Sequence, residues 1–322
     1  MIVNLYDVVN KYRHINLDLV NISQSIDLPS LSNIQRDAEF NKKLYNLNKI
    51  YVFGDSLCDV GNSFDVTSLA LGQPIPATPP YFCGRFSNGR VWVEYLAELL
   101  GINHDRCTNF AVGGANTGNT NTLVPNNSIG LLGLQQQIDK FKAENYQPDS
   151  QSLYIIWAGA NDYLSGSITD LTISTKNLSN AVQSLVDEGA KNIMILNLPD
   201  LGLLPAIRND SQKSVLLTNL TKLHNSTLEN SLEALRQSFC ESIRIMSIDV
   251  YSLFNQVFSN PKEFGFTNVK DSALAQYEKF QGCSETFFFW DEIHPTTAAH
   301  LMLAKIALKV LAPVKELSLV ES

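Results

Sequence analysis

No stretch of the sequence approaches the roughly 20 consecutive apolar residues that a membrane-spanning helix needs, so we expect no integral membrane segment. Clustered positive charge is also missing, because the formal net charge is −8 and Lys and Arg are scattered along the chain. This distribution disfavours nucleic acid and anionic membrane surfaces as partners. The sequence leaves the oligomeric state open, and a monomer is our working expectation.

Cysteine is scarce, and its placement argues against a structural metal site. No cysteine lies in a Cys-x-x-Cys pair or a Cys/His cluster, the arrangements that hold zinc. An odd number leaves at least one free thiol or an intermolecular bridge, and the sequence does not define internal pairs. The five residues are Cys58, Cys83, Cys107, Cys240 and Cys283.

The N-terminal sequence lacks the basic segment and uninterrupted apolar run of a secretory signal peptide. We therefore expect a cytoplasmic location, with export by another route as the alternative. We interpret residues 1–48 as an N-terminal extension, 49–314 as one domain and 315–322 as a C-terminal tail.

Short apolar strands alternate with amphipathic helices from residue 49 onward. Their continuous apolar character predicts an α/β fold with a mainly parallel sheet covered on both faces. Ligands bind such sheets beyond the carboxyl ends of the strands. We expect irregular structure at 69–89 and 260–286, strands at 50–53, 108–112, 152–158, 192–198 and 242–249, and helices at 91–101, 131–144, 171–189, 211–237 and 296–311.

Four of the expected strand ends carry residues suited to catalysis. Ser56 follows the first strand in the tetrapeptide Gly54-Asp55-Ser56-Leu57, just before an expected helix. A helix N-terminus stabilises developing negative charge, which would favour a nucleophilic serine there. The alternative is that Asp55 or Ser56 is a helix N-cap.

The next two strand ends offer hydrogen-bond donors. The pair Gly113-Gly114 allows the backbone to approach a reacting group and turn an N–H toward it. Asn161, after the strand 152–158, could add a side-chain amide to such an oxyanion site. Each has a structural alternative, a tight turn for the glycines and a turn residue for Asn161.

The fourth strand end holds Asp291 and His294, three positions apart. A histidine base needs one ring nitrogen on the nucleophile and the other on a carboxylate, and this spacing allows the second contact locally. No other histidine has a carboxylate three positions earlier. Pro295 favours a loop conformation for His294 at a helix entrance, and we interpret Glu292 as a solvated neighbour.

Taken together, five blocks of the chain resemble the GDSL esterase/lipase family of the SGNH hydrolase superfamily. They occur in the order of the family and span roughly 50–312: FGDSLCDVGN, PPYFCGRFSNGRVWVEYLA, NFAVGGANT, WAGANDYL and FWDEIHPTTAAH. The resemblance implies a flavodoxin-like three-layer α/β/α sandwich with no metal and no organic cofactor.

The resemblance also implies a role for each candidate. Ser56 would be the nucleophile, His294 the base and Asp291 its orienting carboxylate. The Ser56 backbone N–H, Gly114 and Asn161 would form the oxyanion hole, with Gly113 as the alternative to Gly114.

We expect a carboxylic ester hydrolase acting through an acyl-enzyme, with a small-molecule or lipid ester as substrate. Short and medium acyl chains are favoured over two alternatives, phospholipase A/lysophospholipase and carbohydrate O-acetyl esterase. A binding protein without activity is the alternative of a different class. Other residues are ambiguous: 198–207 could line an acyl pocket or pack under a helix, 287–290 reads as a buried strand, and Arg85 as a structural arginine.

Overall fold

The chain was analysed as a computed structural model that describes residues 3–15, 41, 45–144, 149–166, 170–239, 242–277 and 286–311. Its centre is a five-stranded sheet in the order β2-β1-β3-β4-β5, and every neighbouring pair is parallel. The strands are β1 Lys49–Gly54, β2 Cys107–Asn109, β3 Ser152–Trp157, β4 Asn192–Leu196 and β5 Arg244–Ile248. The predicted parallel sheet is therefore confirmed.

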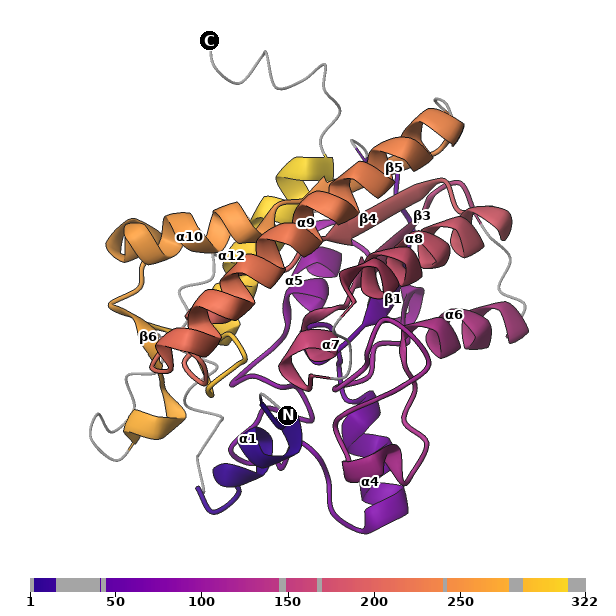
Figure 1. Cartoon of the computed structure of the whole chain (residues 1–322). Helices are drawn as coiled ribbons and strands as arrows, with labels where there is room; N and C mark the ends of the chain where they lie inside the picture. Colours follow the sequence, from indigo (N-terminus) through magenta and orange to yellow (C-terminus); the bar gives the residue numbers. More distant parts are fainter. Residues whose placement is uncertain are drawn as a thin grey trace.

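Helices cover both faces of this sheet. Successive side chains of a strand point to opposite faces, so a strand with continuous apolar residues has two faces to bury. Ile50 and Val52 pack with one set of helices, while Tyr51 and Phe53 pack with the other. Figure 1 shows α6, α8 and α9 in front of the sheet and α5 and α12 behind it. The three-layer α/β/α sandwich is thus confirmed. The front helices are α6 Leu134–Ala143, α8 Leu171–Asp187 and α9 Ser211–Phe239, and those packing on the other face are α5 Trp92–Leu99, α10 Val250–Ser259 and α12 Thr297–Leu311.

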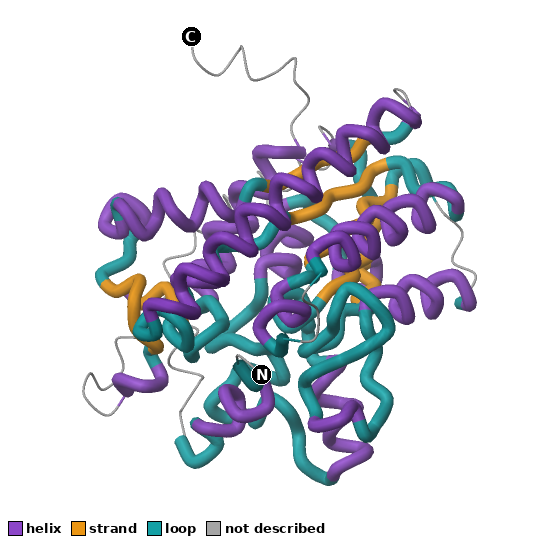
Figure 2. The backbone as a smooth tube through the Cα atoms, in the orientation of Figure 1, coloured by secondary structure: helices purple, strands orange, loops and turns teal. Residues whose placement is uncertain are grey.

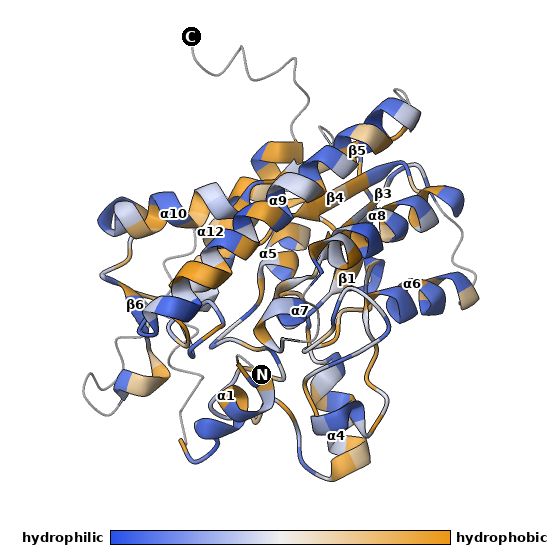
Figure 3. Ribbon diagram, viewed as in Figure 1, coloured by the Kyte–Doolittle hydropathy of each residue, from blue (hydrophilic) through white to orange (hydrophobic). Residues whose placement is uncertain are grey.

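The apolar pattern of the helices explains this packing. The helix α8 begins at the N-cap Asp170, whose side chain accepts a hydrogen bond from the Thr172 N–H. Its buried positions recur at helical spacing and include Leu178, Val182 and Leu185. Figure 3 shows the outcome, with hydrophilic residues on the outward faces of α6 and α8 and apolar residues along β4.

Two short helices lie outside the three layers, at the end of the molecule where the loops gather (Figure 2). They are α1 Leu5–Lys11 and α4 Asn62–Leu71, and a five-residue helix, α7 Ala160–Leu164, directly follows β3. A second, two-stranded parallel sheet consists of β6 Asn268–Ser272 and β7 Phe287–Phe289. The strand β6 was not predicted, since its sequence was expected to be irregular.

The helix α1 belongs to the interpreted extension 1–48 but packs against the domain. Leu5 and Val9 are buried with Trp290 in one apolar cluster. The Val3 N–H donates to the Leu164 carbonyl at the end of α7, with 2.6 Å between N and O. The described part of the extension therefore packs against the segment that carries Asp291.

Candidate active site

Ser56 lies in a turn that follows β1. The Asp55 carbonyl accepts the N–H groups of Cys58 and Asp59, each at 3.0 Å, and the Asp55 carboxylate accepts the Leu57 N–H at 3.0 Å. The helix expected at Ser56 begins only at Asn62, with Gly61 as its N-cap. The prediction of a helix start at Ser56 was wrong because Asp55 closes a local turn instead.

Ser56, His294 and Asp291 form a continuous hydrogen-bonded row. The His294 Nε2 atom is 2.9 Å from the Ser56 Oγ atom, and His294 Nδ1 is 2.6 Å from Asp291 Oδ2. Ser56 is 5% exposed, whereas His294 and Asp291 have no exposed surface. The structure thus brings together the three residues that the sequence singled out for the same reaction.

The surroundings of Asp291 keep it a hydrogen-bond acceptor. Its Oδ1 accepts the N–H groups of Ile293 and His294 at 2.7 Å each, and its Oδ2 accepts the Tyr81 hydroxyl at 2.7 Å. Burial opposes ionisation, but His294 and these N–H groups hold the Asp291 pKa below its ordinary value. The ionised carboxylate therefore accepts a hydrogen bond from the Nδ1–H group, which leaves Nε2 to accept one from the Ser56 hydroxyl.

The loop around His294 is held from both sides. The Trp290 N–H donates to the His294 carbonyl at 2.7 Å, and the Thr296 N–H donates to the Phe288 carbonyl at 2.8 Å. The Phe86 ring lies 5.1 Å from the His294 ring, measured between ring centroids. These contacts place His294 before α12, not on it, as Pro295 predicts.

The two glycines of the pair differ in how their N–H groups are used. The Gly113 N–H donates to Asp59 Oδ2 at 2.9 Å and to Ser63 Oγ at 2.8 Å. Within the described ranges, the N–H groups of Gly114 and Ser56 donate to no protein acceptor. Gly114 has φ +77°, a left-handed conformation that glycine adopts readily. The geometry therefore favours Gly114 over Gly113 as an oxyanion donor.

Asn161 lies in α7, beside both of these turns. Its Nδ2 atom donates to the Ala115 carbonyl at 3.1 Å and lies 3.4 Å from Asp55 Oδ2. The amide therefore links the Gly113–Ala115 turn to the turn that carries Ser56. The oxyanion role of Asn161 remains a prediction.

We expect Asn161→Ala to lower kcat by about 10²–10³ with a small change in KM, because one oxyanion donor is removed. Steady-state kinetics with a p-nitrophenyl ester would measure this. Asn192→Ala is the matched control, since it removes a partly buried amide at the opposite, amino end of the sheet, where Asn192 donates to Ser150. Equal effects of the two changes would contradict the role of Asn161.

Asp55 is a buried carboxyl group next to Ser56, and its only role predicted from the sequence was that of a possible cap. Desolvation raises the pKa of Asp55 to about 7, although the Leu57 N–H and His294 act in the opposite direction. In the unfolded chain the same group ionises near pH 4. The native state therefore retains a proton that the unfolded state loses between these two pH values.

The free energy of unfolding should consequently fall as pH rises from about 4 to 7. Asp55→Asn removes this dependence. The free energy of unfolding of the variant, measured relative to the wild type, should therefore be higher at pH 8 than at pH 4 by roughly 2–4 kcal/mol. Urea unfolding of both proteins at the two pH values measures the difference. If the variant differs from the wild type by the same free energy of unfolding at pH 4 and pH 8, Asp55 is not the source of the pH dependence.

Glu292 differs from its predicted state. It was interpreted as a solvated neighbour, but its side chain is 15% exposed and accepts hydrogen bonds from Lys11 and Tyr12 of the α1 segment. The interpretation was wrong because the packing of the N-terminal segment could not be read from the local sequence. Tyr81 was also missed, although it lies in the second of the five blocks.

Three ambiguous segments are resolved by the structure. Arg85 is structural, because its guanidinium binds the Glu94 carboxylate at 2.7 Å and the Cys83 carbonyl at 2.7 Å. Within 198–207, Leu198 and Leu201 are buried in the core, and η3 Leu201–Leu203 packs under α9. The expected strand at 287–290 is present as the buried β7.

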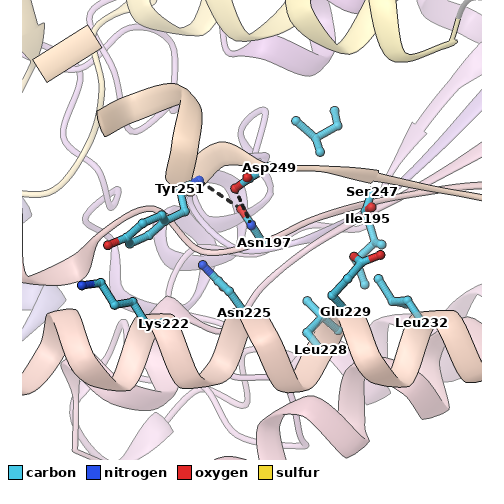
Figure 4. Close-up of a pocket in the computed structure, with 11 residues that line it drawn as sticks. Ile195, Asn197, Lys222, Asn225, Leu228, Glu229, Leu232, Ser247, Asp249 and Tyr251 are labelled. Atoms are coloured by element: carbon cyan, nitrogen blue, oxygen red, sulfur yellow. Dashed lines mark hydrogen bonds between the residues drawn. The ribbon is translucent and has the colours of Figure 1, made fainter. Parts of the chain in front are cut away.

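One cavity of the molecule lies away from Ser56, His294 and Asp291. A cavity of about 400 Å³ lies between α9 and the ends of β4 and β5, and Figure 4 shows Asn197 at its centre, hydrogen-bonded to Asp249. Ser56, Asp291 and His294 do not line it. The described ranges contain no cluster of His, Cys, Asp or Glu side chains that could hold a metal ion. They also contain no helix long and apolar enough to cross a membrane. Cys240 and Cys283 lie outside these ranges, and the other three cysteines are unpaired thiols.

A serine, a histidine and an aspartate hydrogen-bonded in a row are the arrangement of serine hydrolases, which recurs on unrelated folds. Here the row lies beyond the carboxyl ends of a parallel sheet, where open α/β folds place their sites. Fold and site together define the class as α/β serine hydrolases.

The chain belongs to the family described as GDSL-like Lipase/Acylhydrolase, whose model matches residues 50–307. It is 30% identical over 282 residues to a thermolabile hemolysin of Vibrio parahaemolyticus, a match that covers 80% of this chain and 62% of the hemolysin. It is 28% identical over 312 residues to a phosphatidylcholine-sterol acyltransferase of Aeromonas hydrophila, which covers 81% of this chain and 89% of that protein. A lipolytic G-D-S-L protein structure from Veillonella parvula matches 81% of this chain and 97% of its own, with a TM-score of 0.46 and 19% identity.

Proposed function

We propose that the protein is a serine esterase that hydrolyses carboxylic esters through an acyl-enzyme on Ser56. The observation that carries the proposal is the hydrogen-bonded row of Ser56, His294 and Asp291. The distance is 2.9 Å from Ser56 Oγ to His294 Nε2 and 2.6 Å from His294 Nδ1 to Asp291 Oδ2. A protein that only bound esters would have no need for a histidine held in the tautomer that accepts a proton from a serine.

In the first half of the reaction, Ser56 Oγ attacks the ester carbonyl and its proton passes to His294 Nε2. The carbonyl oxygen becomes an oxyanion that accepts hydrogen bonds from the N–H groups of Ser56 and Gly114 and from Asn161 Nδ2. The intermediate collapses, the bond to the alcohol oxygen breaks, and His294 gives the proton to the departing alcohol.

Water then repeats these steps in the second half. His294 takes one proton from the water as its oxygen attacks the acyl-enzyme carbonyl, and Ser56 Oγ leaves with that proton. The products are a carboxylic acid and the free enzyme. Throughout the cycle Asp291 stays ionised and stabilises the imidazolium form of His294.

Short and medium acyl chains are the favoured substrates. Ser56 is 5% exposed, and aromatic side chains such as Phe86 and Trp290 are fully buried around the His294 loop. A long acyl chain would have to displace these buried aromatic side chains, whereas an acetyl or butyryl group would displace little. The second candidate is an acyl ester of a phospholipid, because a relative that is 28% identical is named a phosphatidylcholine-sterol acyltransferase.

Labelling with a fluorophosphonate probe tests the reaction, because the probe bonds only to an activated serine. We expect labelling of the wild type and none of Ser56→Ala; a folded wild type that stays unlabelled would show the proposal to be wrong. For the substrate, p-nitrophenyl esters of increasing chain length should be compared with phosphatidylcholine, lysophosphatidylcholine and an acetylated sugar. A higher kcat/KM for the phospholipids, or for the acetylated sugar, would replace the favoured substrate class.

A further inference from the structure

The orientation of one peptide decides whether Gly114 can act as proposed. The Gly114 N–H and the Gly113 carbonyl belong to the same planar peptide unit, and in a trans peptide they point in opposite directions. Whatever holds the Gly113 carbonyl therefore also aims the Gly114 N–H. Two glycines in sequence are free to rotate this unit, so the aim depends on neighbouring side chains.

Asn121 holds the carbonyl side of this peptide. Its Nδ2 atom donates to the Gly113 carbonyl at 2.9 Å and to the Leu132 carbonyl at 3.2 Å, while its Oδ1 accepts the Leu123 N–H at 2.8 Å. The side chain is 5% exposed and thus almost sealed from water. All three contacts fix one orientation of the amide, with its N–H groups toward Gly113.

Asp59 holds the preceding peptide, Val112–Gly113, and ties it to the nucleophile turn. Its Oδ2 accepts the Gly113 N–H at 2.9 Å and the Ser63 N–H at 3.1 Å, and its Oδ1 accepts the N–H groups of Gly61 at 2.8 Å and Asn62 at 2.7 Å. Asp59 itself has no exposed surface.

The backbone of Asp59 adds a direct link to the serine. Its N–H donates to the Asp55 carbonyl at 3.0 Å, which closes the turn that contains Ser56. The same residue therefore sets the position of the nucleophile turn through its backbone and that of the glycine turn through its side chain. The Asn161 amide, which contacts Ala115 and approaches Asp55, closes the arrangement on the opposite side.

We propose that Asn121, which holds the Gly113–Gly114 peptide, and Asp59, which holds the peptide before it, are positioning residues that direct the Gly114 N–H at the oxyanion. The inference rests on the proposed function, since it concerns the donor that would stabilise the transition state of ester cleavage. Neither residue touches the reacting atoms, and both act through the backbone of the glycine turn.

Asn121→Asp is the sharpest variant, because it keeps the shape and the acceptor for Leu123 but places an oxygen against the Gly113 carbonyl. Two acceptors repel each other, so the peptide should rotate. Asp59→Asn acts on the preceding peptide: its oxygen can still accept from Gly61 and Asn62, but its amide faces the N–H groups of Ser63 and Gly113. Since Asp59 is fully buried, Asn121→Asp decides the question if Asp59→Asn does not fold.

Thr122→Val is the matched control. The Thr122 hydroxyl donates to the Gly114 carbonyl at 3.1 Å, in the next peptide of the same turn, and the Thr122 N–H keeps a bond to that carbonyl at 2.8 Å. The change therefore removes a hydrogen bond from the turn without releasing the Gly113–Gly114 peptide. It should leave kcat within about threefold of the wild type, because exposed or duplicated hydrogen bonds contribute little.

The experiment measures kcat, KM and the inhibition constant of a short-chain trifluoromethyl ketone, which adds to the serine as a tetrahedral oxyanion. We expect Asn121→Asp and Asp59→Asn to lower kcat by about 10- to 100-fold and to weaken the ketone by a similar factor, with KM within about threefold. Thermal unfolding and fluorophosphonate titration establish the folded, reactive fraction of each variant.

Three results would overturn the inference: an Asn121→Asp enzyme as active as Thr122→Val, a change in KM alone, or a loss of kcat without weaker ketone binding. A wild type that hydrolyses the ester and binds the ketone upholds the proposed function in each of these cases. A wild type that does neither rejects the proposed function before any variant is compared.

Discussion

Ser56→Ala is expected to reduce kcat/KM for ester hydrolysis by roughly 10⁴-fold or more, the largest loss of any single change in this protein. Alanine has no oxygen to form the acyl-enzyme, and His294 loses the hydroxyl that it now contacts at 2.9 Å. A small rate above the uncatalysed reaction should remain, because the N–H groups of residue 56 and Gly114 still stabilise an oxyanion. Active-site titration before the kinetics excludes wild-type contamination.

Ser87→Ala provides the matched control for this change. Ser87 is also a buried serine, and its hydroxyl donates to the Pro295 carbonyl at 2.9 Å, next to His294. Its loss should lower stability by about 1 kcal/mol and leave kcat/KM within tenfold, roughly the effect expected of a small shift in position. An active Ser56→Ala enzyme would refute the acyl-enzyme mechanism.

Asp291→Asn is expected to lower kcat by about 10⁴-fold with little change in structure. The asparagine oxygen can keep the bonds from the Ile293 and His294 N–H groups, so its amide nitrogen occupies the present Oδ2 position. That nitrogen donates to Nδ1 and forces the hydrogen of His294 onto Nε2. The imidazole can then no longer accept the Ser56 proton.

Tyr81→Phe tests whether the charge or the hydrogen-bond network around Asp291 matters more. It removes the hydroxyl that donates to Asp291 Oδ2 at 2.7 Å but leaves the carboxylate on His294. We expect a loss of about tenfold, the low end of what one hydrogen bond to a charged group contributes. Stopped-flow or steady-state kinetics on both variants would distinguish the two effects, and equal losses would contradict the tautomer argument.

Much of the fold could be predicted from periodicity. The helix expected at 296–311 occurs as α12 Thr297–Leu311, and the strand expected at 152–158 occurs as β3 Ser152–Trp157. Both are long or strongly apolar, so local pattern and tertiary packing agree. The resemblance to the GDSL family is likewise confirmed by the match over 50–307.

The errors have both local and long-range causes. The helix expected at Ser56 is displaced to Asn62, because the Asp59 carboxylate accepts the N–H groups that open α4. The expected strand at 108–112 occurs as the shorter Cys107–Asn109, although the Phe110 and Val112 N–H groups still donate to carbonyls of β1. The strand β6 was missed because its pairing with β7 joins segments that have no shared local signal.

Individual site residues also differ in how far the sequence could reveal them. Asp291 and His294 are three apart, so a local motif was sufficient to suggest their pairing. Asp59 accepts the Gly113 N–H and Asn121 donates to the Gly113 carbonyl, and no spacing in the sequence indicates either contact. The supporting contacts therefore required the structure.

The hydrogen bond between Ser56 and His294 joins residues 238 positions apart. During synthesis the serine emerges early, but its base follows only after all five strands of the main sheet have been made. A nascent or truncated chain that ends before His294 therefore carries Ser56 without its hydrogen-bond partner. For the same reason, recovery of ester cleavage after dilution from denaturant would report closure of the whole fold and not of any part of it.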